Sequence, residues 1–301
     1  MEKMRLSHYY IKKEGATNML KKWVGALLAI AMLTVGFAGC GTQENQNYAV
    51  LTDNFGEEEY AIGFRKEDVA FRNEVQNALH EMQEDGTINT IIQKWFQKDF
   101  DKTIEKVEEP ATDGSWEYIQ SKGTIVMGLD DAVPPMGFRD ENTNEIVGVD
   151  VDLAKEVAQR LGVELQLQPI DWNAKEMELE TKKIDIIWNG LTVTPERQEQ
   201  MLFSASYLDN TQAIAVMEGS GIQTKADLAG KKVGVQAGSN ALESMKKDAI
   251  FDSIGEENIQ EYDTMLTALM DLKIGRIDAV VADETVVRYN ISKQQENQQA
   301  E

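Results

Sequence analysis

The chain of 301 residues has one cysteine and two histidines, His8 and His80. A single cysteine excludes an intrachain disulfide. So few thiols and imidazoles leave almost no ligands for zinc and no Cys/His nucleophile. Basic residues are also scarce, because 30 Lys and Arg stand against 52 Asp and Glu, a formal net charge of −22. That balance argues against nucleic acid, whose phosphates require a basic surface. We therefore expect no metal, no cofactor and no nucleic-acid partner.

Long apolar runs are equally scarce, and the one candidate lies near the N-terminus. Residues 19–23 carry two lysines, residues 24–37 are predominantly apolar, and Ala-Gly-Cys follows at 38–40. This layout is that of an export signal peptide. Its end resembles a bacterial lipobox, which implies that Cys40 is lipidated and becomes the first residue of the mature chain. An ordinary cleaved signal and an uncleaved membrane anchor are the alternatives.

The lipobox implies a lipoprotein signal peptide at 1–40 and a tether at 41–46. The body is then anchored by the lipid on Cys40 to the extracellular face of the cell membrane, which is the periplasmic side in a Gram-negative cell. Residues 1–18 make an unusually long lead, so Met19 is a second candidate start.

The body alternates short apolar runs with segments of helical periodicity. The predicted strands are 60–65, 124–129, 163–168, 184–188, 212–217, 232–235 and 277–282, and the predicted helices are about 68–84, 88–98, 150–161 with Asp150 as cap, 173–180, 238–249 and 263–274. Such alternation favours an α/β fold with helices over mainly parallel sheets. Ligands bind beyond the carboxyl ends of the strands in such sheets. The polar turns after 124–129, 184–188, 232–235 and 277–282 are therefore the expected walls of one site.

The most informative stretch is 184–197, which reads IDIIWNGLTVTPER. It predicts a buried strand, a polar turn with a glycine, and a helix capped by Thr194 with Pro195 at its first position. Arg197 then lies in a first helical turn, where the helix dipole disfavours a cation by a few tenths to about 1 kcal/mol. A bound anion held by the guanidinium and the N–H groups of the turn would offset this. A surface ion pair with a neighbouring glutamate is the alternative.

Several stretches together resemble the polar amino-acid-binding proteins of bacterial ABC importers, the extracellular solute-binding proteins of family 3. They are 57–68 with 81–96, 128–141, 148–162, 184–207, 227–240 and 275–284. The resemblance implies a two-lobe type II periplasmic-binding-protein fold that closes over its ligand. It also implies a receptor that binds a free amino acid, either polar, charged or cystine, and passes it to an ABC permease.

The order of these stretches differs from the family's order. Residues 57–96 resemble the family's final third, yet they precede 116–290, which resemble its first two thirds. The resemblance therefore implies a circular permutation. The repeat of Gln-Glu-Asn-Gln at 43–46 and 295–298 is what a trimmed tandem duplication would leave, although polar chain ends also coincide by chance.

The permutation implies two lobes that are each made from two pieces of chain. Lobe 1 is predicted at 58–102 plus 113–210, lobe 2 at 47–57 plus 211–292, a linker at 103–112 and a polar tail at 293–301. The two crossings between the lobes, near 55–60 and 208–212, would form the hinge.

The resemblance also implies roles for individual residues. Arg197 would clamp the α-carboxylate of the ligand, with the Thr192 hydroxyl and the Gly190 region. Asp283 would take the α-ammonium, with the Gly190 carbonyl as helper. Arginine suits the first role because its planar fork is bidentate and stays charged.

Other positions of the resemblance concern the opposite lobe and the ligand side chain. Gly238, Ser239 and Asn240 would meet the carboxylate through backbone N–H groups and the Ser239 hydroxyl. Asp130, Trp172 and Trp188 match positions that line family pockets. Asp130 could equally cap the turn that follows it, and Trp172 could equally belong to the core.

Other functions compete with transport. Dehydratases of the cyclohexadienyl type share this fold and need a general acid or base, for which Asp130, Asp131 and Glu178 are the candidates. No histidine maps to the pocket, so we expect no catalytic residue. A ligand-sensing domain for a signalling partner and a rearranged product without function are the remaining alternatives.

Overall fold

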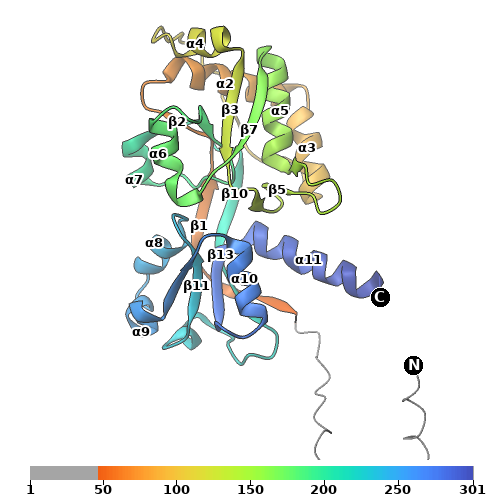
Figure 1. The fold of residues 1–301 in the computed structure, drawn as a ribbon, viewed down its shortest axis with the longest axis vertical. Helices are drawn as coiled ribbons and strands as arrows, with labels where there is room; N and C mark the ends of the chain where they lie inside the picture. The colour runs from red at the N-terminus through yellow and green to blue at the C-terminus, as the bar shows by residue number, and fades with distance from the viewer. Residues whose placement is uncertain (1–46, 301) are drawn as a thin grey trace, which may run out of the picture. The chain divides into compact units, whose positions relative to one another are not determined.

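The computed structural model describes residues 47–300 (Figure 1). The predicted signal peptide, the tether and Cys40 lie outside the described residues. Asn47–Glu301 forms one compact unit by its contacts. It is built around two five-stranded sheets and one three-stranded sheet, with helices packed against them. Among the described helices, none has the length and apolar character needed to cross a bilayer.

The first sheet joins both ends of the described chain. Strand β1 (Tyr48–Tyr60) pairs antiparallel with β10 (Leu208–Met217), and β10 pairs antiparallel with β13 (Ala279–Asp283). β11 (Val233–Gln236) lies parallel to β13 and to β12 (Ile259–Tyr262). The prediction of mainly parallel sheets is wrong here, because β10 runs back between two strands of the opposite direction. In Figure 1, the long strands β1 and β10 of this sheet extend toward the second large sheet.

The second sheet is formed by the middle of the chain and one early strand. β3 (Thr124–Leu129) lies parallel to β7 (Glu164–Pro169) and to β8 (Ile186–Ile187). β2 (Gly63–Arg65) pairs antiparallel with β8 and with β9 (Met201–Phe203). The single strand predicted at 60–65 is therefore two strands, one in each sheet. A small third sheet contains β4 (Ala132–Val133), β5 (Gly137–Arg139) and β6 (Ile146–Val147).

Helices follow most of the strands. Those from the early and middle chain are α2 (Val69–Glu84), α3 (Thr87–Phe96), α4 (Ser115–Lys122), α5 (Val149–Leu161), η1 (Trp172–Ala174), α6 (Lys175–Glu180) and α7 (Pro195–Gln200). Those from the later chain are η2 (Lys225–Leu228), α8 (Ala241–Lys246), α9 (Phe251–Ile254), η3 (Glu256–Asn258), α10 (Met265–Lys273) and α11 (Glu284–Ala300). Residues 293–300, predicted as a polar tail, continue α11.

The prediction that Asp150 caps α5 is wrong. The helix begins at Val149 after Gly148, and Asp150 is fully buried inside its first turn. Its carboxylate accepts hydrogen bonds from the Gly190 N–H (2.8 Å) and the Tyr207 hydroxyl (2.9 Å). The acid therefore holds the glycine turn after β8 in place.

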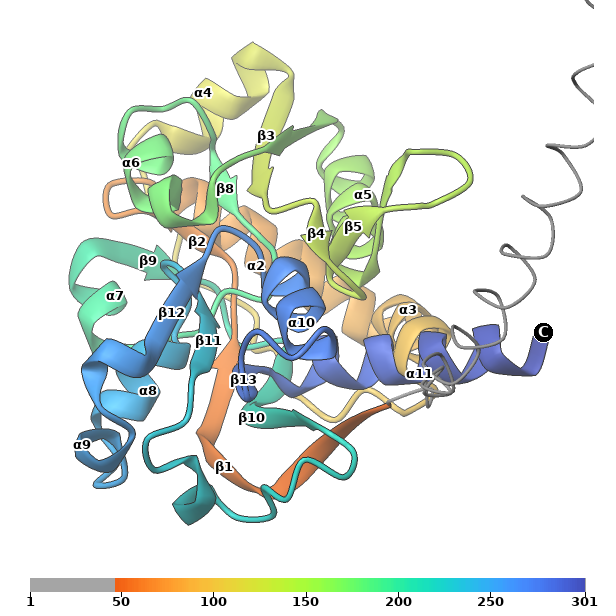
Figure 2. The same cartoon turned by 60° about the horizontal axis from the view of Figure 1, so that its bottom comes forward.

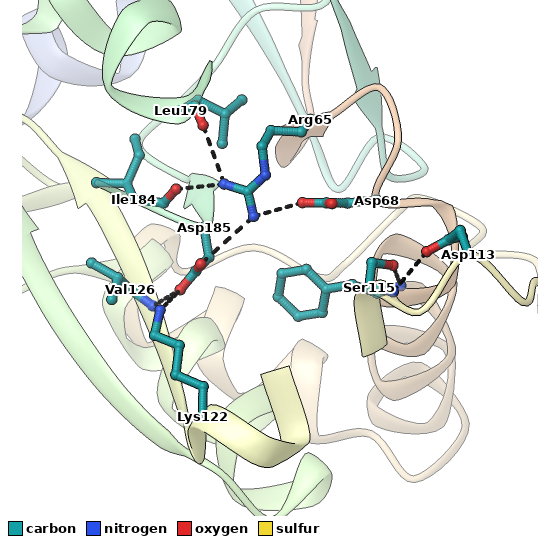
Figure 3. A network of polar contacts seen from close by, with 10 residues as sticks. Arg65, Asp68, Asp113, Ser115, Lys122, Val126, Leu179, Ile184 and Asp185 are labelled. Carbon is teal, nitrogen blue, oxygen red and sulfur yellow. Dashed lines mark hydrogen bonds and ion pairs between the residues drawn. The ribbon is translucent and has the colours of Figure 1, made fainter. Parts of the chain in front are cut away.

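A buried ion-pair network fastens the early strand β2 to the middle of the chain (Figure 3). The Arg65 guanidinium lies 2.7 Å from Asp68 and 3.6 Å from Asp185, and it donates to the Ile184 carbonyl at 2.7 Å. Lys122 pairs with the same Asp185 at 2.6 Å. Two segments that are far apart in sequence thus share one polar core, and breaking one partner would leave another charge buried and unpaired.

The predicted linker at 103–112 has no regular secondary structure, but it is held along α2. Gln76 donates to the Glu105 carbonyl at 2.8 Å, and the Val107 N–H donates to Asn77 at 2.8 Å. These bonds satisfy backbone groups that a strand or helix would otherwise pair.

Candidate functional site

A small cavity lies where strand ends of the two large sheets meet, as predicted for the polar turns. Its lining residues are Val133, Trp172, Asn189, Gly190, Thr192, Arg197, Gln236, Ser239, Asn240 and Asp283. Its volume is about 10 Å³, which is room for roughly one water molecule. Helix α10, which packs against the first sheet, lies beside β4 in Figure 2, so the two sides of this cleft are in contact.

Arg197 reaches the cavity from the first turn of α7. Thr194 caps this helix by accepting a hydrogen bond from the Arg197 N–H (3.2 Å), and Pro195 occupies the first helical position. The Arg197 side chain is 13% exposed, and its guanidinium donates to the Thr192 carbonyl at 2.9 Å. It also donates to the Gly238 carbonyl at 3.0 Å, on the opposite side of the cleft. The cation is therefore aimed into the cleft.

The Gly238 turn approaches the other side of the cleft closely. Gly238 has a φ of +70°, and a Cβ placed on it would lie 2.8 Å from Asn173 Cα. Its carbonyl also accepts a hydrogen bond from the ammonium of Lys175 at 2.7 Å. Lys175 is nearly fully buried, and burial followed by the charge of Arg197 lowers its pKa to about 8. Two cations thus converge on one carbonyl oxygen.

Asp283 stands at the end of β13, among neutral donors and a second acid. Its Oδ1 accepts a hydrogen bond from Gln212 Nε2 at 2.5 Å, and the same nitrogen donates to Glu58 Oε1 at 2.8 Å. Glu58 also accepts from Asn210 at 2.6 Å and from Asn240 at 2.9 Å. Burial and then the charge of Glu58 raise the pKa of Asp283 to about 8. Two carboxyl groups therefore share one buried amide.

The Tyr60 ring packs against the Gly190 turn that lines the cavity. It is fully buried at the end of β1, and a Cβ on Gly190 would lie 3.2 Å from it. Burial and the charges of Asp283 and Glu58 raise the pKa of its hydroxyl well above the usual range. The tyrosine therefore remains neutral, and its buried hydroxyl has no hydrogen-bond partner within the described residues.

Asp130 and Gln236 form another contact across the cleft. Gln236 Nε2 donates to Asp130 Oδ2 at 2.6 Å, and the Ala132 N–H donates to Asp130 Oδ1 at 3.0 Å. Asp130 thus organises the following turn and also contacts Gln236 at the end of β11. Asn189 accepts from the Asp130 N–H at 3.1 Å, while its buried Nδ2 has no hydrogen-bond partner within the described chain.

Most of the predicted site residues meet at this cavity. Those that line it are Arg197, Asp283, Thr192, Gly190, Ser239, Asn240 and Trp172. The Gly238 carbonyl accepts a hydrogen bond from Arg197, and Asp130 accepts one from the lining residue Gln236. Two of the expected ligand donors are engaged within the protein. The Gly190 N–H donates to Asp150, and the Ser239 hydroxyl donates to the Gln236 carbonyl.

Trp188 is not a lining residue, which corrects the prediction. Its side chain is fully buried and meets Tyr207 edge-on, with ring centroids 5.9 Å apart. Alternation along β8 explains this, because Ile186 and Trp188 enter one core cluster and Ile187 enters another.

The acid–base candidates of the enzyme alternative are mostly engaged elsewhere. Asp131 is paired with Arg139 at 2.6 Å, and Glu178 is paired with Lys183 at 2.7 Å. Neither lines the cavity. Over residues 47–300, the structure holds no group of three or more His, Cys, Asp or Glu side chains that could bind a metal ion.

Several residues of the site were not predicted from the sequence: Glu58, Gln236, Lys175, Asn189 and Gln212. Glu58 belongs to a run of three glutamates that looks like a solvated edge. Strand alternation was the available signal, because Glu58 and Tyr60 share one side of β1 and are buried, whereas Glu57 and Glu59 are exposed.

The sequence profile of the bacterial extracellular solute-binding proteins, family 3, matches residues 2–98 and 125–279. The chain therefore belongs to this family. It is 33% identical over 179 residues to the L-cystine-binding protein TcyJ of Escherichia coli (strain K12), covering 59% of this chain and 65% of TcyJ. It is 32% identical over 165 residues to the arginine-binding extracellular protein ArtP of Bacillus subtilis (strain 168), covering 55% and 63%. The chain thus spans slightly less than two thirds of the length of these relatives.

Solved structures agree with this assignment. An ABC uptake transporter substrate-binding protein from Streptococcus pneumoniae with bound histidine has a TM-score of 0.59 and 36% identity, covering 61% of this chain and 76% of that one. The arginine-bound form of truncated ArgBP from T. maritima has a TM-score of 0.54 and 41% identity, covering 59% and 81%. The predicted two-lobe α/β periplasmic-binding-protein fold is confirmed.

Proposed function

We propose that the protein is an extracellular receptor that binds a free amino acid and passes it to an ABC importer. The observation that carries this proposal is that Arg197, from α7, and Asp283, from the end of β13, line the same cavity. A zwitterion needs one cation and one carboxylate in the same site. The names of TcyJ and ArtP, which specify cystine and arginine, support an amino acid as the ligand.

Each end of the zwitterion has its own partners in this proposal. Arg197 exchanges the Gly238 carbonyl for the ligand carboxylate, with the Thr192 and Ser239 hydroxyls beside it. Asp283 and the Gly190 carbonyl receive the ammonium. Hydrogen bonds to charged groups of this kind contribute about 1.5–3 kcal/mol each, so the two ends together supply most of the affinity. Trp172 and Asp130 stand nearest to the ligand side chain.

Binding requires that the cleft opens and closes. A cavity of about 10 Å³ is too small for any amino acid. The contacts that cross it, Gln236 to Asp130 and Arg197 to Gly238, must therefore break to admit one. We propose that lobe 1 (58–102 plus 113–210) moves against lobe 2 (47–57 plus 211–292) about the strands β1 and β10. Ligand then favours the closed state because it touches both lobes.

We further propose that the chain is a circular permutant of its family. Tyr48, at the start of β1, donates its N–H to the Gln294 side chain in α11 at 3.4 Å, across 246 positions. The two ends of the fold are therefore close enough for the chain to have been joined there and opened elsewhere. Permutations are tolerated where termini are exposed and near one another.

The cellular location is a separate proposal, which rests on the lipobox. Cys40 carries the lipid, and the body lies outside the cell membrane. Expression of the full chain in a Gram-positive host with radiolabelled palmitate should label it and leave it in the membrane fraction. Cys40→Ser should remove the label and release protein into the medium, and labelling that persists in this variant would contradict the assignment.

Thermal unfolding of residues 41–301 with each of the twenty amino acids and cystine tests the binding function. One or a few of them should raise the melting temperature, as ligands of the folded state do. Arg197→Ala and Asp283→Ala should each abolish the rise. A rise that persists in both variants would disprove the clamp, and turnover of prephenate or arogenate would favour the enzyme alternative.

A further inference from the structure

Glu58 and Asp283 form an unusual pair of buried acids behind the cavity. Both are less than a tenth exposed, and both accept a hydrogen bond from the same nitrogen of Gln212. Gln212 Nε2 lies 2.8 Å from Glu58 Oε1 and 2.5 Å from Asp283 Oδ1, so a single nitrogen bridges the two carboxyl groups. The other donors to Glu58 are the amides of Asn210 and Asn240, which carry no charge.

The surroundings neutralise this pair only in part, because the cation that faces both acids, Arg197, is also bound by two carbonyls. Towards the cavity, the charged or titratable neighbours are Tyr60 on β1 and Arg197 on α7, whose guanidinium is bound to two carbonyls. On the outer side, Glu58 lines a groove of about 820 Å³ whose other charged residues are Glu57, Glu59, Lys98, Asp209, Glu284 and Arg288. On that side Lys102 is paired with Glu59 and Asp209, and Arg288 is paired with Glu284, so these cations are engaged by other acids. Two full negative charges on Glu58 and Asp283 would therefore stand together in a buried place. Like charges so placed are strongly disfavoured.

We propose that Glu58 and Asp283 hold one shared proton in the unliganded cleft, and that the ammonium group of the ligand replaces this proton on binding. This inference rests on the proposed function. The ligand brings one positive charge to the pair and the proton leaves as one positive charge, so the buried charge stays balanced. Glu58 is thereby a second acid of the ammonium site and not only a hinge residue.

The fold provides a way out for the proton. Glu58 accepts from Asn240, which lines the cavity, and it also borders the solvent-open groove between β1, α3 and α11. The proton can therefore pass from Glu58 to water while the cleft closes over the ligand. The raised pKa of Asp283, about 8, fits this role. The pair then keeps its proton at neutral pH until the ammonium group of the ligand replaces it.

Ligand affinity should depend on pH. Because the ammonium competes with a proton, affinity rises with pH below about pH 8, and the dissociation constant falls about tenfold per pH unit. Without Glu58, Asp283 loses the neighbouring charge that disfavours its ionised form. Affinity in a Glu58→Gln variant should therefore change little between pH 6 and pH 7.5.

Titration calorimetry of residues 41–301 tests this with L-arginine, L-cystine and L-histidine as probes. Comparison of binding enthalpies in phosphate and Tris at pH 7 counts the protons released. The wild type should release about one proton per ligand, and Glu58→Gln should release close to none while still binding. Glu57→Gln, one residue away and exposed, is the matched control and should behave like the wild type.

The outcomes separate the two proposals. Binding without proton release in the wild type overturns the shared proton and leaves the receptor function intact. Unchanged proton release in a folded Glu58→Gln variant also overturns it, because another group must then supply the proton. Absence of binding heat with every probe, together with no thermal shift by any amino acid, overturns both proposals.

Discussion

Arg197 and Gly238 join the two sides of the cleft through a hydrogen bond of 3.0 Å from the guanidinium to the glycine carbonyl. Beside this hydrogen bond the backbone of the Gly238 turn approaches Asn173 so closely that a Cβ on Gly238 would lie 2.8 Å from Asn173 Cα. The arginine that we propose as the carboxylate clamp thus donates to a carbonyl on the far side of the cleft. If the proposed function is correct, ligand binding and cleft closure are coupled through this side chain.

Gly238→Ala should separate closure from folding. The φ of +70° strains an alanine by about 1–2 kcal/mol, and the new methyl group meets Asn173 only when the cleft is closed. Ligand affinity should fall at least about tenfold, as measured by titration calorimetry. Gly230→Ala is the matched control, because its φ is +67° and nothing lies within 4 Å of the added Cβ. Equal loss of affinity in both variants would mean that strain alone is responsible.

Lys175→Met should alter the pH dependence of stability. The pKa of Lys175 is lowered from 10.5 to about 8, so between these values the unfolded chain binds more protons than the folded one. The wild type therefore gains stability as pH rises from 8 to 10.5, by up to about 3 kcal/mol. The free energy of unfolding in urea, compared at pH 8 and pH 10, should show this gain in the wild type and not in the Met variant.

A control variant helps to read that comparison. Lys183→Met removes a lysine whose side chain is 60% exposed, and it should keep the gain of the wild type. If Lys175→Met keeps the gain as well, then Lys175 is not the group that titrates. Burial would then not lower the pKa of Lys175 in the folded protein.

Tyr207→Phe should destabilise the fold more at alkaline than at acid pH. The Tyr207 hydroxyl donates to Asp150, whose pKa burial raises from 3.8 to about 7. The stability that comes from this raised pKa is present at low pH and lost as pH rises through 7. Because an ionised carboxylate needs its donors most, the variant should lose about 2 kcal/mol at pH 8 and about 1 kcal/mol at pH 5. Urea unfolding measures both.

The exposed Tyr118 provides the comparison for that variant. Tyr118→Phe removes a hydroxyl from a side chain of which 48% is exposed, and it should change stability little at either pH. A loss for Tyr207→Phe that is the same at pH 5 and pH 8 would argue that Asp150 does not ionise in this range.

Local patterns predicted much of the site. The strand, turn and helix start around Thr194 and Pro195 brought Arg197 to the cleft, and the end of the strand at Asp283 gave the opposing acid. Both depend on spacing along one short stretch of chain. The family resemblance then supplied which of the polar turns face one another.

Contacts between distant segments could not be predicted in the same way. Gln236 and Asp130 meet across 106 positions, and Lys175 meets Gly238 across 63, so neither pairing leaves a mark in its own neighbourhood. Trp188 was misassigned because a buried strand exposes neither face, and only the packing of both sides decides which face meets the ligand. Buried charge was missed at Glu58 because glutamate runs are usually solvated.

Restoring the family's order of segments tests the permutation. A chain in which residues 113–298 precede 47–112 would join Gln298 to Asn47 and open the linker before Asp113. The Tyr48 N–H already contacts Gln294, so residues 295–298 are long enough to close the gap once they leave α11. This chain should unfold cooperatively, with a melting temperature within a few degrees of the original and the same ligand-induced shift.

A chain opened inside β10 is the matched control and should not fold, because β10 pairs with strands on both sides. If the restored order fails to fold while the natural order folds, the two orders are not equivalent, and the present order is required by contacts other than those between β1 and α11.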